Sequence, residues 1–101
     1  MANPVKNDKR FLVIQMTWRE YVAATDTWGW CDLCGTNDFS ANGGIGYYIP
    51  IINQWYCKNC YDLWYSGATH YRVDAEKERQ AYNEMKSKLE RLGVWNTQEN
   101  A

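Results

Sequence analysis

Two features are missing from this sequence, and each absence narrows what the chain does. No stretch approaches the roughly 18 consecutive apolar residues of a membrane-spanning helix, and residues 1–10 lack the apolar centre of a secretory signal. We therefore expect an intracellular, cytoplasmic protein without membrane contact. Positive charge is not in excess either, because 11 basic and 12 acidic residues give a formal net charge of -1. This balance argues against binding nucleic acid by bulk attraction to phosphates.

The placement of the cysteines is the most specific signal in the sequence. The four cysteines form two C-x-x-C pairs. A gap of two residues lets both thiolates of a pair bind one ion, and two such pairs complete a tetrahedral set of sulfur ligands. The sequence therefore predicts a metal site with Zn²⁺ as the first choice and iron as the alternative that sulfur ligands also favour. The predicted metal ligands are Cys31, Cys34, Cys57 and Cys60.

Paired cysteines have two other uses. Four thiols form two disulfides in many secreted domains, but no secretory signal is visible here. The run from Trp30 to Cys34 also has the form of a thioredoxin-type redox site. Redox catalysis needs an attacking thiolate and a resolving thiol, whereas here a second pair is available to share a metal. Metal binding is therefore the prediction.

The length and composition fit one domain with a modest core. The chain has 101 residues, of which 46% are hydrophobic and 16% aromatic, which excludes overall disorder. Residues 1–9 are polar and are expected to form a flexible arm. Residues 10–95 are expected to form a single zinc-binding domain, and residues 96–101 a frayed tail. A structural metal would help a chain of this size, because its core is limited.

The segment before the first cysteine pair carries a strand signal and then a helix signal. The apolar run at residues 11–14 contains β-branched side chains and predicts a strand. Thr17-Trp18-Arg19-Glu20 follows, and this is a capping-box pattern. We expect a short helix that begins there and ends near Thr25.

The remainder of the chain predicts a β-hairpin and two helices. Residues 46–49 and 54–56 are expected to be the strands of the hairpin. The first helix is expected from Tyr61 to Gly67. The second extends from about residue 74 to 92 and should end at a glycine cap. Its apolar residues recur on one face, as expected for a helix that packs on a core, and are Tyr82, Met85, Leu89 and Leu92.

A C-x-x-C turn, a hairpin and a helix with the second C-x-x-C pair occur in the order that resembles the treble-clef zinc fingers. The resemblance covers about residues 28–68 and rests on the segments CDLCG and CKNCYDLW with the hairpin between them. It implies an α+β fold, a small zinc-stabilised domain, here flanked by an N-terminal strand and helix and a long C-terminal helix. The flanking segments resemble no family that we can name. A zinc ribbon or rubredoxin-like iron site is the alternative, but both usually have glycine after each pair, and only Gly35 fits.

The same resemblance implies a structural metal. Nuclease members of the treble-clef group use a histidine at the hairpin with further metal ligands. The one histidine here, His70, lies beyond the second cysteine pair and is expected to be a surface or hinge residue. Four thiolates leave no open position for water on zinc. We therefore expect no enzymatic activity.

The aromatic residues of the hairpin and the following helix predict a binding surface. Aromatic side chains alternate at positions 47–48 and 55–56, so some are expected to point away from the core. Tryptophan and tyrosine are frequent anchors of protein interfaces. The alternative is that a small domain simply packs its core with large residues. The predicted partner-binding residues are Tyr48, Trp55 and Trp64.

The last helix carries charges of both signs, which predicts a solvated face. A phosphate-binding stripe is the alternative. The basic residues Lys77, Arg79, Lys86, Lys88 and Arg91 are interspersed with Glu76, Glu78, Glu84 and Glu90.

Together these features predict a non-enzymatic, zinc-binding interaction protein. We expect a small adaptor or inhibitor that docks on a protein or nucleoprotein partner. A phage-encoded inhibitor of a host or defence nuclease would fit this size and build. The alternative is a nucleic-acid-binding zinc finger, which would use a local basic face for direct contact.

Overall fold

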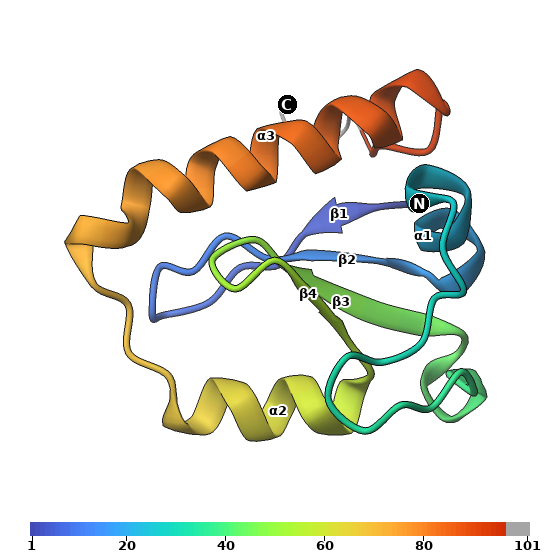
Figure 1. Ribbon diagram of the computed structural model, residues 1–101, viewed down its shortest axis with the longest axis horizontal. Coiled ribbons are helices and arrows are strands. Elements are labelled where there is room, and N and C mark those ends of the chain that lie inside the picture. Colours follow the sequence, from blue (N-terminus) through green and yellow to red (C-terminus); the bar gives the residue numbers. More distant parts are fainter. Residues whose placement is uncertain (97–101) are drawn as a thin grey trace.

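The fold is a four-stranded antiparallel sheet with helices on both of its faces (Figure 1). The computed structural model describes residues 1–96. In order across the sheet, the strands are β1 (Asn3–Pro4), β2 (Ile14–Thr17), β3 (Ile45–Ile49) and β4 (Gln54–Tyr56). The helices are α1 (Trp18–Thr25), α2 (Lys58–Gly67) and α3 (Ala75–Arg91), with short 3-10 turns η1 (Ser40–Asn42) and η2 (Arg72–Asp74). The predicted α+β class and long C-terminal helix are confirmed.

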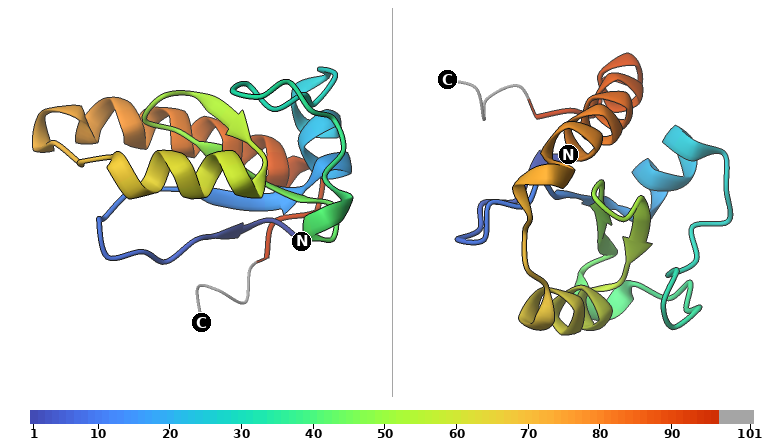
Figure 2. Two further views of the ribbon diagram at one scale, coloured as in Figure 1. Left: turned by 90° about the horizontal axis from the view of Figure 1, so that it is seen from below. Right: turned by 60° about the vertical axis from the view of Figure 1, so that its left-hand side comes forward.

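The sheet lies between α2 and α3. Figure 1 shows α3 along one face and α2 along the other, and the right-hand view of Figure 2 shows the same arrangement. On the α2 side, the rings of Tyr47 and Tyr61 stack with centroids 4.4 Å apart. On the α3 side, Met85 and Leu89 are buried in the core. Both sets of alternating side chains on the central strands are therefore enclosed.

No helix within residues 1–96 has both the length and the apolar character needed to cross a bilayer.

Three local signals in the sequence are confirmed by the backbone. The capping box of α1 is complete, because the Glu20 amide donates to Thr17 Oγ1 over 3.1 Å and the Thr17 amide donates to Glu20 Oε1 over 2.8 Å. The helix ends at Thr25, as predicted. Beyond α3, Gly93 has a φ of +74°, the left-handed geometry that closes many helices.

The first strand and α2 begin at positions different from those predicted. The position of the strand is set by its hydrogen-bonded pairing with β3, which extends from Ile14 to Thr17 rather than over residues 11–14. The helix α2 begins at Lys58, three residues before the expected start at Tyr61. Its first intrahelical bond joins the Tyr61 amide to the Cys57 carbonyl over 2.8 Å, which places the second cysteine pair at the start of the helix.

Residues 1–9, predicted to be a flexible arm, contribute a strand to the sheet instead. Asn3 and Pro4 pair with β2 at the sheet edge, where proline is tolerated because one side of the strand needs no hydrogen-bond donor. Ala2 is buried, and its amide donates to the Val94 carbonyl over 2.8 Å. Backbone hydrogen bonds hold this segment against the sheet, and such bonds cannot be inferred from its polar composition.

The frayed tail predicted at residues 96–101 falls mostly outside the described residues. Within them, the Asn96 amide donates to the Ala2 carbonyl over 2.9 Å. Residue 96 is therefore part of the closure between the two ends of the chain.

Candidate metal centre

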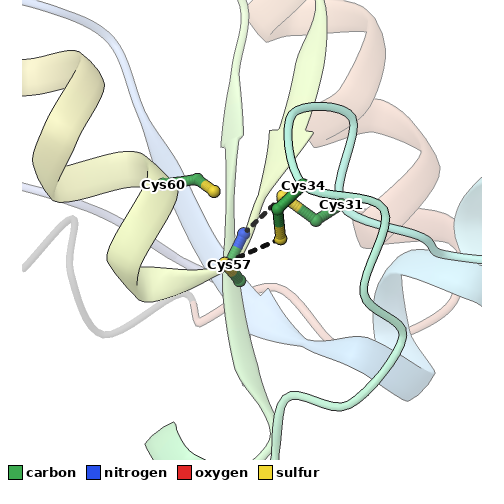
Figure 3. A group of neighbouring side chains, drawn as sticks. All are labelled: Cys31, Cys34, Cys57 and Cys60. Atoms are coloured by element: carbon green, nitrogen blue, oxygen red, sulfur yellow. Dashed lines mark hydrogen bonds between the residues drawn. The ribbon is translucent and has the colours of Figure 1, made fainter.

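The four cysteines come from two separate parts of the fold and meet at the end of β4. Cys31 and Cys34 lie on the long loop between α1 and η1. Cys57 is the N-cap of α2, and Cys60 lies in the first turn of that helix. Figure 3 shows the loop and the helix start facing each other with the four side chains between them. The four Sγ atoms all lie within 4.8 Å of one another.

The spacing of the sulfurs fits a tetrahedral metal ion. With metal–sulfur bonds of about 2.3 Å, the edges of a tetrahedron are about 3.8 Å long. The Sγ atoms of Cys34 and Cys57 are 3.8 Å apart, a separation shown as a dashed line in Figure 3. All four cysteines are free, and this distance is well beyond the roughly 2.05 Å of a disulfide. The cluster can hold a metal ion, and its donor set suits zinc as well as iron.

A tight turn brings the first cysteine pair together. The Gly35 amide donates to the Cys31 carbonyl over 2.9 Å, and the Cys31 amide donates to the Thr36 carbonyl over 2.8 Å. Gly35 has a φ of +78°, which glycine adopts without the steric penalty of a side chain. The glycine after Cys34 therefore allows the left-handed backbone on which this turn depends.

Asp32 attaches this turn to the sheet. Its amide donates to the Trp55 carbonyl over 2.8 Å, and its carboxylate accepts a 2.8 Å hydrogen bond from the Trp55 amide. The turn is thus bonded to β4 two residues before Cys57. The Cys57 amide in addition donates to the Cys31 Sγ over 3.4 Å. These hydrogen bonds hold the two cysteine pairs in position relative to each other without a metal.

The thiols of the cluster differ in their acidity. Burial raises the pKa of the Cys31 thiol, but amide hydrogen bonds from Cys34, Cys57 and Leu33 outweigh burial and lower that pKa to about 7. Burial raises the pKa of Cys57 and, more strongly, of Cys60. A metal binds the thiolates, so loading the site releases protons and its affinity falls in acid.

A cleft of about 430 Å³ opens beside the cluster. Cys34 is exposed at this side, whereas Cys31 and Cys60 are buried. The basic side chain in the cleft wall, Lys58, forms a 2.7 Å ion pair with Asp62. The lining residues are Cys34, Thr36, Asp38, Phe39, Ala41, Asn42, Ile45, Cys57, Lys58, Asn59 and Cys60.

Two of the three predicted partner-binding residues are buried in the core, so their predicted exposure is wrong. Trp55 is 0% exposed, and it stacks on Tyr21 of α1 with ring centroids 4.1 Å apart. Tyr48 is 4% exposed, and its hydroxyl donates to Asn53 Oδ1 over 2.6 Å. Alternation along β3 and β4 correctly separates two faces, but helices cover both. Trp64 is half-buried and packs on Phe11 at 4.7 Å between centroids.

His70 and Glu78 form a buried pair away from the cysteines. Glu78 is 2% exposed, which contradicts the solvated position predicted for it. Its Oε1 lies 2.8 Å from His70 Nε2, and its Oε2 accepts a 3.0 Å hydrogen bond from the Leu12 amide. The histidine is thus half-buried rather than a surface residue, and it joins the linker after α2 to α3.

The sequence interpretation overlooked the exposed side chains of residues 26–39, the loop that carries Cys31 and Cys34 and is called the metal loop below. Trp28 is 79% exposed, Trp30 56% and Leu33 52%. A detectable signal was the glycine between the two tryptophans, because glycine is preferred where the backbone packs closely or has a positive φ, as Gly29 does here. A second signal was charge, since no Lys, Arg or His occurs between Arg19 and Lys58.

No protein-family model, curated protein or solved structure matches this chain.

Proposed function

We propose that this chain is a non-enzymatic interaction protein in which a treble-clef-like zinc unit positions a loop for docking on a partner protein. The observation that carries the proposal is the four-cysteine cluster itself. It connects the exposed loop after α1 to the start of α2, and the loop presents Trp28 and Trp30 to solvent. A metal at this point would fix the loop before it meets a partner, which lowers the entropy lost on binding.

The order of elements supports the treble-clef assignment. The ligand turn at Cys31–Cys34 precedes the β3–β4 hairpin, and the second ligand pair opens α2. A helix N-terminus carries partial positive charge, which stabilises thiolates there. Zinc bound to all four sulfurs would supply structural cross-linking between loop and helix.

The ligand set also supports a role without catalysis. Four sulfur ligands close a tetrahedral metal, so no coordination position remains for a water or a substrate. The histidine that a hydrolytic mechanism could use is bonded to Glu78 in the linker before α3. The proposed activity is therefore binding.

The proposal is tested first by metal content. We expect one zinc per chain in the purified protein, and we expect Cys31→Ser and Cys57→Ser to lose it together with native stability. The control is Ser66→Ala, an exposed position on α2 outside the cluster. A fully folded Cys57→Ser protein, or wild type without stoichiometric metal, would contradict the structural role. Stoichiometric iron in protein purified from its source would instead support the rubredoxin-like alternative.

The second test is capture of a partner from the source cell. The zinc-loaded chain is immobilised, the lysate is treated with nuclease, and both the protein and the nucleic acid retained are identified. We expect a specific protein to be retained after nuclease treatment. Retention that disappears with the nucleic acid would favour the alternative of a nucleic-acid-binding zinc finger.

A further inference from the structure

We propose that the metal loop binds an arginine-rich segment of a partner protein through Trp28 and Trp30 together with the carboxylates of Asp26 and Asp38. This inference rests on the proposed interaction function and specifies the chemistry of the partner. These four residues, which all lie on the loop between α1 and η1, are called the acidic tryptophan surface below.

The first argument is that the fold holds the two tryptophans outward. The glycine between them, Gly29, is buried, and its carbonyl accepts a 3.0 Å hydrogen bond from Trp55 Nε1 in the core. A Cβ atom on Gly29 would lie 2.6 Å from Trp18 Nε1 and 2.7 Å from Val22 Cγ2. The backbone between the two exposed rings is therefore fixed against α1 and β4.

Two exposed tryptophans on an ordered backbone are better explained by binding than by folding. Two indole rings in water contribute little to the core, because Trp28 is 79% and Trp30 56% exposed. Tryptophan offers a large contact area with few rotatable bonds, and an ordered backbone reduces the entropy lost on association. Such residues are typical anchors of protein interfaces.

The second argument is the charge of this part of the chain. Residues 20–57 contain no basic side chain or histidine, and their acidic residues are Glu20, Asp26, Asp32 and Asp38. Glu20 lies 3.6 Å from the N-terminal amine, and Asp32 is bonded to β4. Within residues 1–96, Asp26 and Asp38 have no ion-pair partner, and both are exposed. Asp38 Oδ1 accepts hydrogen bonds from the amide and the hydroxyl of Ser40 over 3.0 Å and 2.6 Å. A zinc ion on four thiolates would add two further negative charges.

The basic residues lie outside residues 20–57, although Arg19 lines a hollow with Asn37 and Ser40, and Lys88 and Arg91 line one with Ala23 and Ala24. Six of the 11 Lys and Arg residues fall within residues 72–91, which form η2 and α3. Figure 1 shows α3 on the face of the sheet opposite α2, whereas the cysteine cluster lies at the start of α2. Lys58, between the two cysteines of the second pair, lines the same cleft as Asp38 but forms its ion pair with Asp62. Residues 26–39 themselves therefore carry acidic side chains and no basic ones.

Arginine is the side chain that matches both arguments. Its guanidinium plane stacks on indole rings by cation–π attraction, and its donors pair with carboxylates in a bidentate geometry. Lysine satisfies the charge but lacks the planar group. Nucleic acid phosphates fit this loop poorly, because residues 26–39 carry acidic side chains and no basic ones. The occupant that fits is a peptide segment with several arginines.

The inference is tested by calorimetric titration of zinc-loaded protein with four probes. These are a synthetic peptide of alternating Arg and Gly, the matching Lys–Gly and Glu–Gly peptides, and a single-stranded oligonucleotide. We expect the Arg–Gly peptide to bind most tightly, the Lys–Gly peptide more weakly, and the other two not to bind. Tighter binding of the Glu–Gly peptide or the oligonucleotide, or no binding of the Arg–Gly peptide, would overturn the inference.

Variants then locate the site. Trp28→Ala and Trp30→Ala should each weaken Arg–Gly binding by about tenfold or more, as interface anchors do. The matched control is Tyr71→Ala, which removes an exposed aromatic ring between α2 and η2. Asp26→Asn and Asp38→Asn should weaken binding and reduce its dependence on salt, with Glu76→Gln on α3 as their control. Unchanged binding in the tryptophan variants, or equal loss in the controls, would overturn the inference.

Two further measurements keep the outcomes separate. Elemental analysis and circular dichroism verify that each variant contains zinc and is folded. If a tryptophan variant does not fold, the peptide affinities of the two aspartate variants test the inference in its place. The partner-capture experiment is repeated with Trp28→Ala. A partner retained equally by this variant would preserve the proposed function and refute the acidic tryptophan surface, whereas no specific partner for wild type would refute the proposed function.

Discussion

At the scale of single residues, Glu78 is the charged side chain that the fold buries within residues 1–96. We expect Glu78→Ala to lower the free energy of unfolding by about 1–3 kcal/mol, because it leaves the Leu12 amide and the His70 ring without their partner. Urea denaturation of metal-loaded protein measures the change. Glu76→Ala on an exposed turn of the same helix should stay within about 0.5 kcal/mol of wild type. Equal effects at the two positions would show that the buried pair does not stabilise the fold.

Gly29 is a second residue whose environment makes a sharp prediction. We expect Gly29→Ala to be more destabilising than Gly43→Ala, by about 1–3 kcal/mol, because only at Gly29 would the new methyl group also collide with α1. Both positions have positive φ, so backbone strain is common to the pair. Gly67→Ala adds a methyl group in open space without that strain and should be the mildest. Thermal melts of the three variants give the order, and an equal loss at Gly29 and Gly43 would exclude the steric contribution.

The metal ligands were predictable from sequence, whereas the exposed residues were not. Two cysteines that bind one ion must be close in the chain, so spacing alone identifies Cys31 and Cys34 as a pair. Burial of an aromatic side chain depends on what folds over it from elsewhere. Trp55 is covered by Tyr21 and Phe39, both distant in sequence, and its local pattern contains no sign of them.

At the scale of elements, the β3–β4 hairpin was predicted correctly, but its exposure was not. A strand that is covered by helices on both faces can have the same alternation of residues as a strand with one face in solvent. Here helices pack on both faces, and all four aromatic side chains of the hairpin are buried. The capping box of α1 was predictable because it is complete within four residues. The strand β1 was not, because its pairing depends on residues 14–15 and on the last residues of the domain.

Burial of tyrosine hydroxyls on both sides of the sheet predicts how the elements respond to alkali. Burial, with smaller effects of Tyr21 and Glu84, raises the pKa of Tyr48 to about 12. Burial, with smaller effects of Tyr65, Tyr47 and Asp62, raises the pKa of Tyr61 to about 12. Because these folded-state pKa values lie above the ordinary value of 10.0, their contribution to stability is complete below pH 10 and is lost as the pH rises toward 12.

We therefore expect the thermal midpoint to fall between pH 10 and 12 as the buried phenols ionise. Tyrosinate absorbance recorded with circular dichroism measures both events. Tyr48→Phe and Tyr61→Phe should each reduce the slope of stability against pH in this range. The control is Tyr71→Phe at an exposed position, and an equal reduction in that variant would contradict the role of burial.

At the scale of the whole molecule, the metal is expected to join two halves of the fold. Removing it with a chelator should lower the thermal midpoint and increase hydrogen exchange first in residues 28–36, because the turn then depends mainly on the Asp32 bonds to β4. Structural zinc contributes on the order of 10 kcal/mol to small metal domains. Returning zinc should restore both measurements. Identical exchange with and without metal would show that the loop is ordered by the protein alone.

The two ends of the described chain close against each other, and this has a consequence for the order in which the fold is completed. The Ala2 amide bonds to the Val94 carbonyl and the Ala2 carbonyl accepts from the Asn96 amide, so the edge beside β1 must wait until residues 94–96 have left the ribosome. The cysteine cluster needs only residues up to Cys60. During translation, metal binding can therefore come first, and residues 94–96 then complete the edge of the sheet.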